Sequence, residues 1–316
     1  MNLNYKRIIL VTGGAGFVGS CMADKMMENP ENFVVIMDNL LTGSKKRLPS
    51  KDLKNWQFVN ADANNYTDIS AVMLNNSFDY VFHYAAVVGV QRTLDNPIMV
   101  LNDIQGFKYL LDLCKNTGVK RVFYSSSSEV YGEPFEHPQN ELTTPLNSRL
   151  PYAVVKNVGE SFLKSYEKEY GLDYTVFRFF NTYGPKQSTD FVMSKFIKNA
   201  LANEDITIYG DGSQTRTFCY VDDNIEACAN AAYGDKHIND VVNIGSDNEI
   251  QIIDLAKMII TLTGSKSQIK YLPPLMEGDM SRRKPDVTKM RALLGRDLTP
   301  MEDGIKKILD NPSLII

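Results

Sequence analysis

The feature that most constrains the fold of this chain is a glycine-rich turn that directly follows a short apolar run. Residues 8–11 are all aliphatic, and Gly13, Gly16 and Gly19 follow in the spacing G-x-x-G-x-x-G. Residues 14–19 also fit G-x-G-x-x-G. A buried strand that enters such a turn and then a helix is typical of dinucleotide-binding units, because the turn approaches a pyrophosphate and the helix offers it free N–H groups. The candidate phosphate-binding residues are Gly13, Gly16, Phe17, Val18 and Gly19.

Apolar runs alternate with helix-type segments through the first half of the chain. We expect strands at 8–11, 33–37, 56–59, 80–84, 122–124 and 174–180, and helices at about 20–29, 98–115 and 151–170. This alternation predicts an α/β fold with a doubly wound parallel sheet of the Rossmann type. In such sheets ligands bind beyond the carboxyl ends of the strands.

The regular alternation of strands and helices ends at about Asn181, and short strands and helices are mixed after it. We therefore expect residues 1–180 to form the dinucleotide-binding domain and 181–316 a smaller mixed α/β region that covers the ligand. Segments near 218–246, such as Phe218–Tyr220 and Val241–Ile244, are expected to return to the first sheet.

Charge and composition exclude several function classes. The 316 residues include 34 Lys and Arg against 38 Asp and Glu, a formal net charge of −4, so no global attraction to nucleic acid or anionic lipid is expected. Four cysteines and three histidines lack zinc-site spacing, which predicts no metal. No apolar run is long enough to span a bilayer. We expect a cytoplasmic protein that binds neither nucleic acid nor membrane.

An acidic residue at the end of the second strand indicates which dinucleotide is bound. Asp38 follows Gly19 by 19 residues, where a carboxylate can bind both ribose hydroxyls of NAD and repel the 2′-phosphate of NADP. Asn39 follows rather than an arginine, so NAD is the predicted cofactor. Residues at other strand ends add Asp62, Ala63, Ala85, Ala86 and Ser125 to the candidate cofactor-binding residues, together with Asn39.

A tyrosine and a lysine in the spacing Y-x-x-x-K supply candidate catalytic groups. Tyr152 and Lys156 are four residues apart in a predicted helix and so share one face. An ammonium there is expected to lower the tyrosine pKa, so that the phenolate can take a proton from an alcohol. The helix follows the strand that ends in the serines 125–128.

Together, in this order along the chain, the motifs resemble those of the extended short-chain dehydrogenase/reductase family. Within it the chain is similar to the NAD-dependent nucleotide-sugar epimerases, dehydratases and decarboxylases. The resemblance covers essentially the whole chain. The segments that carry it are 13–19, Asp38, 83–86, 125–132, Tyr152 with Lys156, 178–185 and 208–216.

This resemblance implies a role for each matched residue. Tyr152 would remove the proton of the sugar 4-hydroxyl, Lys156 would hold the nicotinamide ribose, and Ser127 would share the hydrogen bond to that hydroxyl. Hydride then leaves C4 for NAD+, which gives a 4-keto sugar. Asn102 would match a structural asparagine near the cofactor, and Asn181 would bind the nucleotide diphosphate with Arg216. The implied partners are a nucleotide sugar, with UDP-sugars favoured, and a second copy of the chain held through the helices at 98–115 and 151–170.

Three fates of the 4-keto sugar remain open. The segment from Ala85 to Pro97, with Arg92, looks like the loop of 4-epimerases, which need no further acid or base. Ser127-Ser128-Glu129 and the stretch 283–286, which begins at Arg283, are similar to UDP-glucuronate decarboxylases. For a 4,6-dehydratase, Glu129 would be the base, but Ser128 replaces the expected acid.

We expect a UDP-sugar 4-epimerase first, a decarboxylase second and a dehydratase third. A non-catalytic NAD-binding protein is least favoured, because Tyr152, Lys156 and Ser127 are all present. Near the C-terminus, the stretch that ends at Asp279 lacks the arginine usual in epimerases, and Arg282 or Arg283 would replace it. The candidate substrate-binding residues are Arg92, Ser127, Ser128, Asn181, Arg216, Asp279 and Arg283, and the candidate catalytic residues are Tyr152, Lys156, Ser127 and Glu129.

Overall fold

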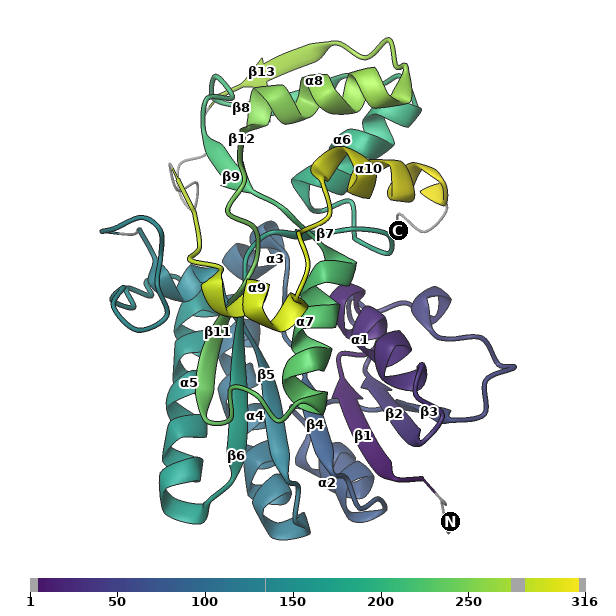
Figure 1. Cartoon of the computed structure of the whole chain (residues 1–316), viewed down its shortest axis with the longest axis vertical. Coiled ribbons are helices and arrows are strands. Elements are labelled where there is room, and N and C mark those ends of the chain that lie inside the picture. Colours follow the sequence, from purple (N-terminus) through teal and green to yellow (C-terminus); the bar gives the residue numbers. More distant parts are fainter. Residues whose placement is uncertain (1–4, 134, 274–281, 313–316) are drawn as a thin grey trace. The chain divides into compact units, whose positions relative to one another are not determined.

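The computed structural model describes residues 5–133, 135–273 and 282–312, apart from the side chains of Val90 and Gln91. Within this part of the chain, seven strands form one parallel sheet in the order β11-β6-β5-β4-β1-β2-β3 (Figure 1). The strands are β1 Arg7–Thr12, β2 Asn32–Asp38, β3 Trp56–Asn60, β4 Tyr80–His83, β5 Arg121–Ser127, β6 Asp173–Phe179 and β11 Asp240–Ile244. The strand order reverses between β1 and β4, which is the point where ligands bind in doubly wound sheets.

Burial explains why these segments are strands. Every residue of β2 is buried, as are the last four residues of β1, and Val11 pairs with Ile36 in a parallel register. Continuous apolar runs of this kind are typical of strands covered by helices on both faces. The α/β fold expected from the sequence is confirmed.

Helices connect the strands and begin and end at residues suited to those positions. The helices around the large sheet are α1 Phe17–Met27, α2 Tyr66–Leu74, α3 Val90–Asp95, α4 Pro97–Thr117, α5 Pro151–Tyr170 and α7 Val221–Tyr233, with short 3-10 helices η1 Lys45–Arg47 and η2 Ser128–Tyr131. Both α4 and α5 start at a proline and end at a glycine with positive φ, Gly118 and Gly171. This is the usual asymmetry of helix ends.

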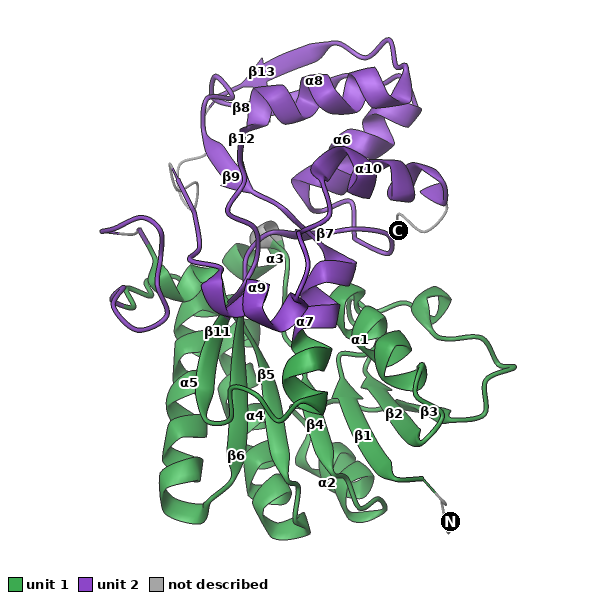
Figure 2. Cartoon of the chain, in the orientation of Figure 1, with its two compact units in different colours: residues 1–132, 146–178, 228–242 green, residues 133–145, 179–227, 243–316 purple. Residues whose placement is uncertain are grey.

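The chain divides into two compact units (Figure 2). Unit 1 comprises residues 1–132, 146–178 and 228–242, and unit 2 comprises 133–145, 179–227 and 243–316. Unit 2 has its own core, built around residues such as Phe196, Ile197, Ile259 and Ile305. Its further elements are β7 Thr182–Tyr183, β8 Ile206–Tyr209, β9 Thr215–Thr217, β10 Cys219–Tyr220, β12 Glu249–Gln251, β13 Ile269–Leu272, α6 Val192–Leu201, α8 Ile252–Thr263, α9 Thr288–Leu294 and α10 Met301–Leu309.

Two details differ from the sequence-based expectation. Residues 241–244 lie in the large sheet, but Cys219–Tyr220 pairs with Thr182–Tyr183 in a separate two-stranded sheet. The first helix begins at Phe17, three residues earlier than expected, because Gly16 already serves as its N-cap. None of the helices in the described part of the chain is both long and apolar enough to cross a bilayer.

Candidate active site

The glycine turn between β1 and α1 brings backbone segments closer together than a side chain would allow. Gly13 has a φ of +67°, and a Cβ there would lie 2.6 Å from the backbone nitrogen of Ala85. A Cβ on Gly19 would collide with the carbonyl oxygen of Gly13. Gly16 caps α1 without a side-chain hydrogen bond, and the first N–H groups of a helix lack acceptors within it. The turn is therefore shaped to receive an anionic group on backbone N–H donors.

The carboxylate of Asp38 lies beside this turn and is held by backbone donors. The backbone nitrogen of Ala15 donates to Oδ2 at 2.9 Å, and that of Leu40 donates to Oδ1 at 2.7 Å. Each carboxylate oxygen can accept more than one hydrogen bond. The side chain is thus fixed in place and keeps the capacity to accept hydrogen bonds from ribose hydroxyls.

The loops after β2 and β3 are joined at the same end of the sheet. Asn39 Nδ2 donates to Asp62 Oδ2 at 3.0 Å, and the backbone nitrogen of Asn64 donates to Asp62 Oδ1 at 2.8 Å. Ala63 is buried next to them. These residues therefore line the carboxyl ends of the strands, where the sequence predicts the adenosine of the cofactor to bind.

The end of β4 is tied to the end of β1 through a buried histidine. Thr12 Oγ1 and His83 Nδ1 are 2.9 Å apart, and the backbone nitrogen of Ala85 donates to Thr12 Oγ1 at 3.3 Å. Burial, with a smaller contribution from the charge of Lys156, lowers the pKa of His83 to about 3. The imidazole is therefore neutral at physiological pH and positions the loop that begins with Ala85 and Ala86.

Tyr152, Lys156 and Ser127 meet where α5 begins and β5 ends. Lys156 Nζ donates to the carbonyl oxygen of Ser125 at 2.6 Å and lies 5.7 Å from the centre of the Tyr152 ring. The side chain of Ser127 is hydrogen-bonded to that of Tyr152. A phenol, a hydroxyl and an ammonium are thus brought together as the Y-x-x-x-K spacing predicts.

The pKa of Tyr152 differs from the sequence-based expectation, and the pKa of Lys156 is shifted as well. Burial raises the pKa of Tyr152 above its usual value, the charge of Glu129 raises it further, and the hydrogen bond from Ser127 opposes both. Burial also lowers the pKa of Lys156 to about 8, and the charge of Asp103 opposes this. In the chain by itself, desolvation therefore outweighs the expected lowering of the tyrosine pKa, because burial disfavours the charged form of each group.

The serine turn after β5 places a carboxyl group beside the catalytic candidates. Ser127 Oγ accepts a hydrogen bond from the backbone nitrogen of Glu129 at 3.2 Å and so caps η2. Ser128 is buried in the same turn. The influence of Glu129 on the pKa of Tyr152 shows that this carboxyl group is within electrostatic reach of the phenol.

A buried ion pair that the sequence analysis missed anchors α5 to the sheet. Arg178 Nη2 lies 2.6 Å from Glu160 Oε2, and Ser126 Oγ donates to Glu160 Oε1 at 2.6 Å. Arg178 Nη1 also donates to Tyr131 Oη at 2.8 Å. The signal was an arginine within the apolar run 174–180, because a charge in a buried strand requires a partner.

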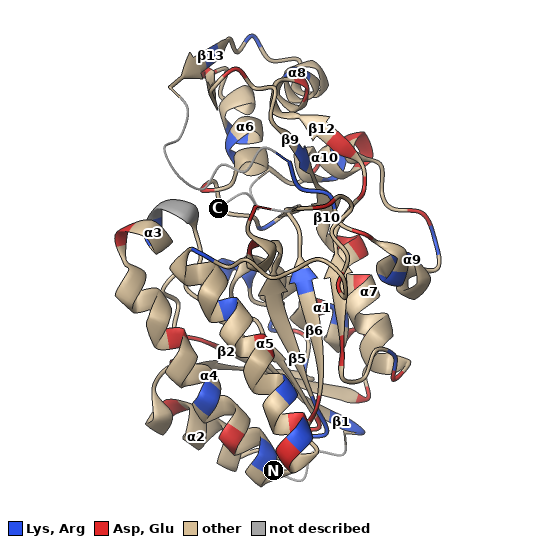
Figure 3. Ribbon diagram, turned by 90° about the vertical axis from the view of Figure 1, so that its left-hand side faces the viewer, with Lys and Arg blue, Asp and Glu red and all other residues tan. Residues whose placement is uncertain are grey.

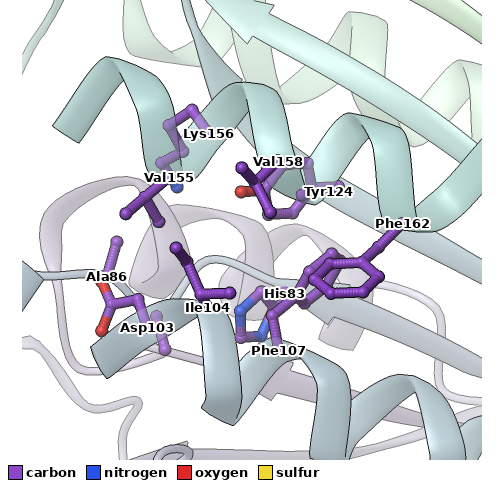
Figure 4. A pocket seen from close by; sticks show the side chains of 12 residues that line it. His83, Ala86, Asp103, Ile104, Phe107, Tyr124, Val155, Lys156, Val158 and Phe162 are labelled. Atoms are coloured by element: carbon purple, nitrogen blue, oxygen red, sulfur yellow. The ribbon is translucent and has the colours of Figure 1, made fainter. Parts of the chain in front are cut away.

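A second missed residue is Asp103 on α4. Its Oδ1 accepts from Asn64 Nδ2 at 2.7 Å and its Oδ2 from the backbone nitrogen of Val87 at 2.9 Å. Asp103 and Lys156 line the same small pocket (Figure 4). Its neighbour Asn102, which the resemblance implied to be near the cofactor, is exposed on α4. One position along a helix turns a side chain by 100°, and the sequence pattern did not distinguish the two.

Of the expected substrate-binding residues, Arg92 belongs to unit 1. It lies half-buried in α3, and its Nη1 donates to the carbonyl oxygen of Val88 at 2.6 Å. Its guanidinium therefore folds back onto the loop that follows β4.

Two further candidates lie in unit 2, next to β9. Asn181 Nδ2 donates to the carbonyl oxygen of Thr217 at 2.9 Å. Arg216 lies on β9, and its Nη1 donates to the carbonyl oxygen of Thr215 at 2.8 Å. Both side chains are half-buried.

The neighbouring residues Arg282 and Arg283 are in different environments. Arg282 donates from Nε and Nη2 to the two carboxylate oxygens of Glu249, at 2.6 and 2.8 Å. This interaction, with a smaller contribution from Lys284, lowers the pKa of Glu249 to about 2. Arg283 is buried, with 6% of its surface exposed. Asp279, the remaining candidate, lies outside the described residues. Arg282 is thus committed to an ion pair within unit 2.

The arrangement in unit 1 fits a dinucleotide. The carboxyl ends of its strands carry the glycine turn, the fixed carboxylate of Asp38 and the pair of Tyr152 and Lys156. Within the described residues, no group of three or more His, Cys, Asp or Glu is placed to hold a metal ion.

Comparisons with known proteins agree with this geometry. Residues 9–245 match the profile of the NAD dependent epimerase/dehydratase family. The chain is 35% identical over 313 residues to UDP-glucuronic acid decarboxylase 1 of Danio rerio, which covers 96% of this chain and 72% of the relative.

Two solved structures are also similar over nearly their whole length. UDP-glucose 4-epimerase from Thermotoga maritima, solved with UDP-glucose, is 32% identical with a TM-score of 0.90, over 97% of this chain and 98% of that one. A dTDP-glucose 4,6-dehydratase from Streptomyces venezuelae, solved with NAD bound, is 27% identical with a TM-score of 0.88, over 98% of each chain.

Proposed function

Because the chain belongs to the NAD-dependent epimerase/dehydratase family, with NAD as its cofactor, we propose that it oxidises a UDP-sugar at C4 and passes through a 4-keto sugar. The observation that carries this proposal is the meeting of Tyr152, Lys156 and Ser127 at the carboxyl end of β5. A phenol held beside an ammonium can act as the general base toward an alcohol.

Each of these residues has a distinct part in the proposed step. Tyr152 takes the proton of the sugar 4-hydroxyl, while Ser127 donates or accepts a hydrogen bond at the same oxygen. Lys156 supplies positive charge that stabilises the phenolate of Tyr152. When bound, NAD+ accepts the hydride from C4 and can return it within the same turnover.

Among the possible fates of the 4-keto sugar, we favour 4-epimerisation. It needs no acid or base beyond the groups already brought together in unit 1, only a rotation of the sugar before hydride returns. The segment from Ala85 to Pro97, which looks like the loop of 4-epimerases, favours the same fate.

Decarboxylation of a UDP-glucuronate is the second candidate. A β-keto acid loses carbon dioxide without a strong base, so the same residues suffice for the chemistry. The similarity to UDP-glucuronic acid decarboxylase 1 and the stretch Arg283–Asp286 favour it. Dehydration ranks third, because Ser128 supplies no acid beside Glu129.

For the nucleotide end of the substrate, we assign the anion-binding role at the C-terminus to Arg283 rather than Arg282. Both carboxylate oxygens of Glu249 already bind Arg282. Asn181 and Arg216 complete the proposed diphosphate site, because arginine donates two parallel hydrogen bonds to such groups. Replacing Arg283 with Met should raise the KM for the nucleotide sugar far more than replacing Arg282 with Met.

We also propose that two copies of the chain associate through α4 and α5. The two helices pack against each other, and their first turns carry few charged residues (Figure 3). Ile98, Met99 and Leu101 are exposed there, and Ile98 is 71% exposed. Sedimentation should give a dimer for the natural chain and a monomer for the Ile98→Glu, Leu101→Glu double variant; a natural monomer would contradict the proposal.

Product analysis tests the proposed reaction. The protein is incubated with NAD+ and, separately, with UDP-glucose, UDP-N-acetylglucosamine and UDP-glucuronate, and the products are separated and weighed by mass spectrometry. Epimerisation gives a product of unchanged mass at a new retention time. Loss of carbon dioxide would establish the decarboxylase instead, and loss of water the dehydratase. Tyr152→Phe is the control in every arm.

A further inference from the structure

Lys156 is an unusual buried cation, because the hydrogen bonds given by the protein account for only some of its N–H donors. Its side chain is 3% exposed, and an ammonium has three N–H donors. The hydrogen bond to the carbonyl oxygen of Ser125 uses one of them. The rings of Tyr124 and Tyr152 lie 5.0 and 5.7 Å from Nζ and offer only their π-faces. A buried charge of this kind needs a counter-charge to remain ionised.

The pocket behind Lys156 contains such a counter-charge. It is lined by Asp103 and Lys156 from the facing helices α4 and α5, with His83 and Tyr124 from the sheet and Phe107 and Phe162 closing it (Figure 4). Its volume of about 10 Å³ has room for roughly one water molecule. Bulk solvent therefore screens the interaction between carboxylate and ammonium only weakly.

Burial raises the pKa of Asp103 above its ordinary value, while hydrogen bonds from Asn64 and Val87 and the charge of Lys156 favour its anionic form. Each of its oxygens accepts a hydrogen bond, one from Asn64 Nδ2 at 2.7 Å and one from the backbone nitrogen of Val87 at 2.9 Å. A Cβ on Gly106 would collide with Asn64 Oδ1, so α4 approaches the Asn64 loop closely because residue 106 is glycine. The carboxylate is thus fixed by hydrogen bonds from two segments outside α5.

The other titratable groups that face Lys156 are neutral in the working range of pH. Burial lowers the pKa of His83 on β4 to about 3 and raises the pKa of Tyr124 on β5 well above its usual value. On α5 itself, burial raises the pKa of Tyr152. Glu160, one turn further along α5, is paired with Arg178 and Ser126. Among the described residues, Asp103 is therefore the charged group that acts on the pKa of Lys156.

We propose that Asp103 is a positioning residue for the proposed oxidation: it keeps Lys156 protonated through the small pocket between α4 and α5. Its charge supports the positive charge of Lys156 and opposes the negative charge of Tyr152, since it raises the pKa of both groups. Removing it should therefore shift both limbs of the pH–rate profile to lower pH. A merely structural role would lower the rate at every pH and leave the limbs where they are.

The neutral variant Asp103→Asn is suited to the test. Its amide oxygen can accept from the backbone nitrogen of Val87, and its amide nitrogen can donate to Asn64 once that amide turns over. The local hydrogen bonds are thus kept while the charge is lost. Asp112→Asn is the matched control, because it removes one negative charge from the same helix, where the half-buried Asp112 pairs with Lys108 and accepts a hydrogen bond from Tyr166 Oη.

The first measurement is made on the protein without substrate. The ε-carbon of lysine is labelled with 13C, the Lys156 signal is assigned with Lys156→Met, and its titration is followed by NMR. The midpoint should lie near pH 8 in the natural protein, since burial lowers the pKa of Lys156 to about 8. In Asp103→Asn it should fall by roughly one pH unit. In Asp112→Asn it should not move, and an unchanged midpoint in Asp103→Asn would overturn the inference.

Two further variants guard against misfolding. Asp103→Ser removes the same charge with a smaller side chain and should give the same shift. Asp103→Glu keeps the charge and should hold the midpoint closer to that of the natural protein than either neutral variant does. A shift in Asp103→Glu as large as in the neutral variants would contradict the inference.

The pH–rate profile is the second measurement, and it depends on the proposed function. Both limbs should move to lower pH in Asp103→Asn, and the limb that follows Lys156 should move by roughly one unit. Because the titration is read in the free protein, the counter-charge role of Asp103 can fail while the proposed oxidation stands. If the natural protein is inactive but shows the predicted titration, the proposed oxidation fails while the counter-charge role of Asp103 stands.

Discussion

At the scale of single residues, the site is dominated by the burial of groups that must carry charge. Desolvation displaces Tyr152 and Lys156 from their ordinary pKa values, each toward its neutral form. Such displacement is typical of catalytic groups, whose proton affinity must match the reaction rather than the solvent. The cost of burying them is a loss of stability that the rest of the fold has to offset.

The role of Tyr152 as the base gives the first prediction. Tyr152→Phe removes the phenolic hydroxyl and leaves the ring, so turnover should fall by at least about a hundredfold, the usual contribution of a positioned base. NAD binding, measured by calorimetry, and thermal stability should stay close to those of the natural protein. Retained full activity would remove Tyr152 from the mechanism.

The burial of Lys156 predicts a pH-dependent stability difference. Its folded pKa of about 8 lies below its unfolded value, so the charged form destabilises the fold below pH 8 and this cost disappears as the pH rises toward the unfolded pKa. Relative to Lys156→Met, the natural protein should gain about 2–3 kcal/mol of unfolding free energy between pH 7 and pH 10. Urea unfolding at a series of pH values measures this difference, and a constant offset would contradict it.

At the scale of helices and strands, two elements carry the site: the glycine turn before α1 and the first turn of α5. The turn depends on close backbone contact at Gly13 and Gly19. The helix depends on Glu160, whose carboxylate binds Arg178 of β6 and Ser126 of β5. Contacts with other segments thus fix the position of each element: close backbone contacts for the glycine turn, and the bonds of Glu160 to two strands for α5.

Gly19→Ala tests the glycine turn. The added methyl group meets the carbonyl oxygen of Gly13, so α1 must shift, and we expect a loss of about 1–3 kcal/mol of stability together with weaker NAD binding. Gly118→Ala is the control, because its Cβ would meet nothing within 4 Å. It should cost only about 1 kcal/mol through its positive φ and leave NAD affinity unchanged. Equal NAD affinity in both variants would argue against the turn as the phosphate site.

Glu160→Ala tests the anchoring of α5. It leaves the guanidinium of Arg178 buried without its carboxylate, which should cost about 3–5 kcal/mol. Asp254→Ala breaks the exposed pair with Lys257 and should cost less than about 1 kcal/mol. Chemical denaturation compares the two, and a similar small loss in both would show that the buried pair does not hold α5.

The sequence predicted features that depend on local patterns, and it failed where contacts between distant segments decide the structure. The parallel sheet, the glycine turn and the pair Tyr152 and Lys156 were accessible because burial, turn geometry and helical spacing are local patterns. Residues 219–220 were placed in the wrong sheet, because strand pairing is decided by tertiary contacts. Asp103 and Glu160 were missed for the same reason: their hydrogen-bond partners lie on other elements, and no local sequence pattern indicates those contacts.

At the scale of the whole molecule, the two units have separate cores and separate parts in the proposed function. Unit 1 contains the cofactor-binding and proton-transfer candidates, and unit 2 contains Asn181, Arg216 and Arg283. In the proposed function, unit 1 therefore carries the oxidation together with the substrate candidates Arg92, Ser127 and Ser128, and unit 2 carries the candidates for binding the nucleotide diphosphate. Changes in unit 2 should alter which nucleotide sugar is used without altering the oxidation at C4.

That oxidation is the central claim, and deuterium at C4 of the sugar tests it most directly. We would mix the protein and NAD+ with the nucleotide sugar that it converts, bearing either hydrogen or deuterium at C4, in a single turnover, and follow the product by mass spectrometry. The account predicts that the deuterated sugar reacts several-fold more slowly and that the product of epimerisation or decarboxylation still carries the deuterium at C4. Equal rates for the two sugars, or loss of the label from C4 to water, would contradict it.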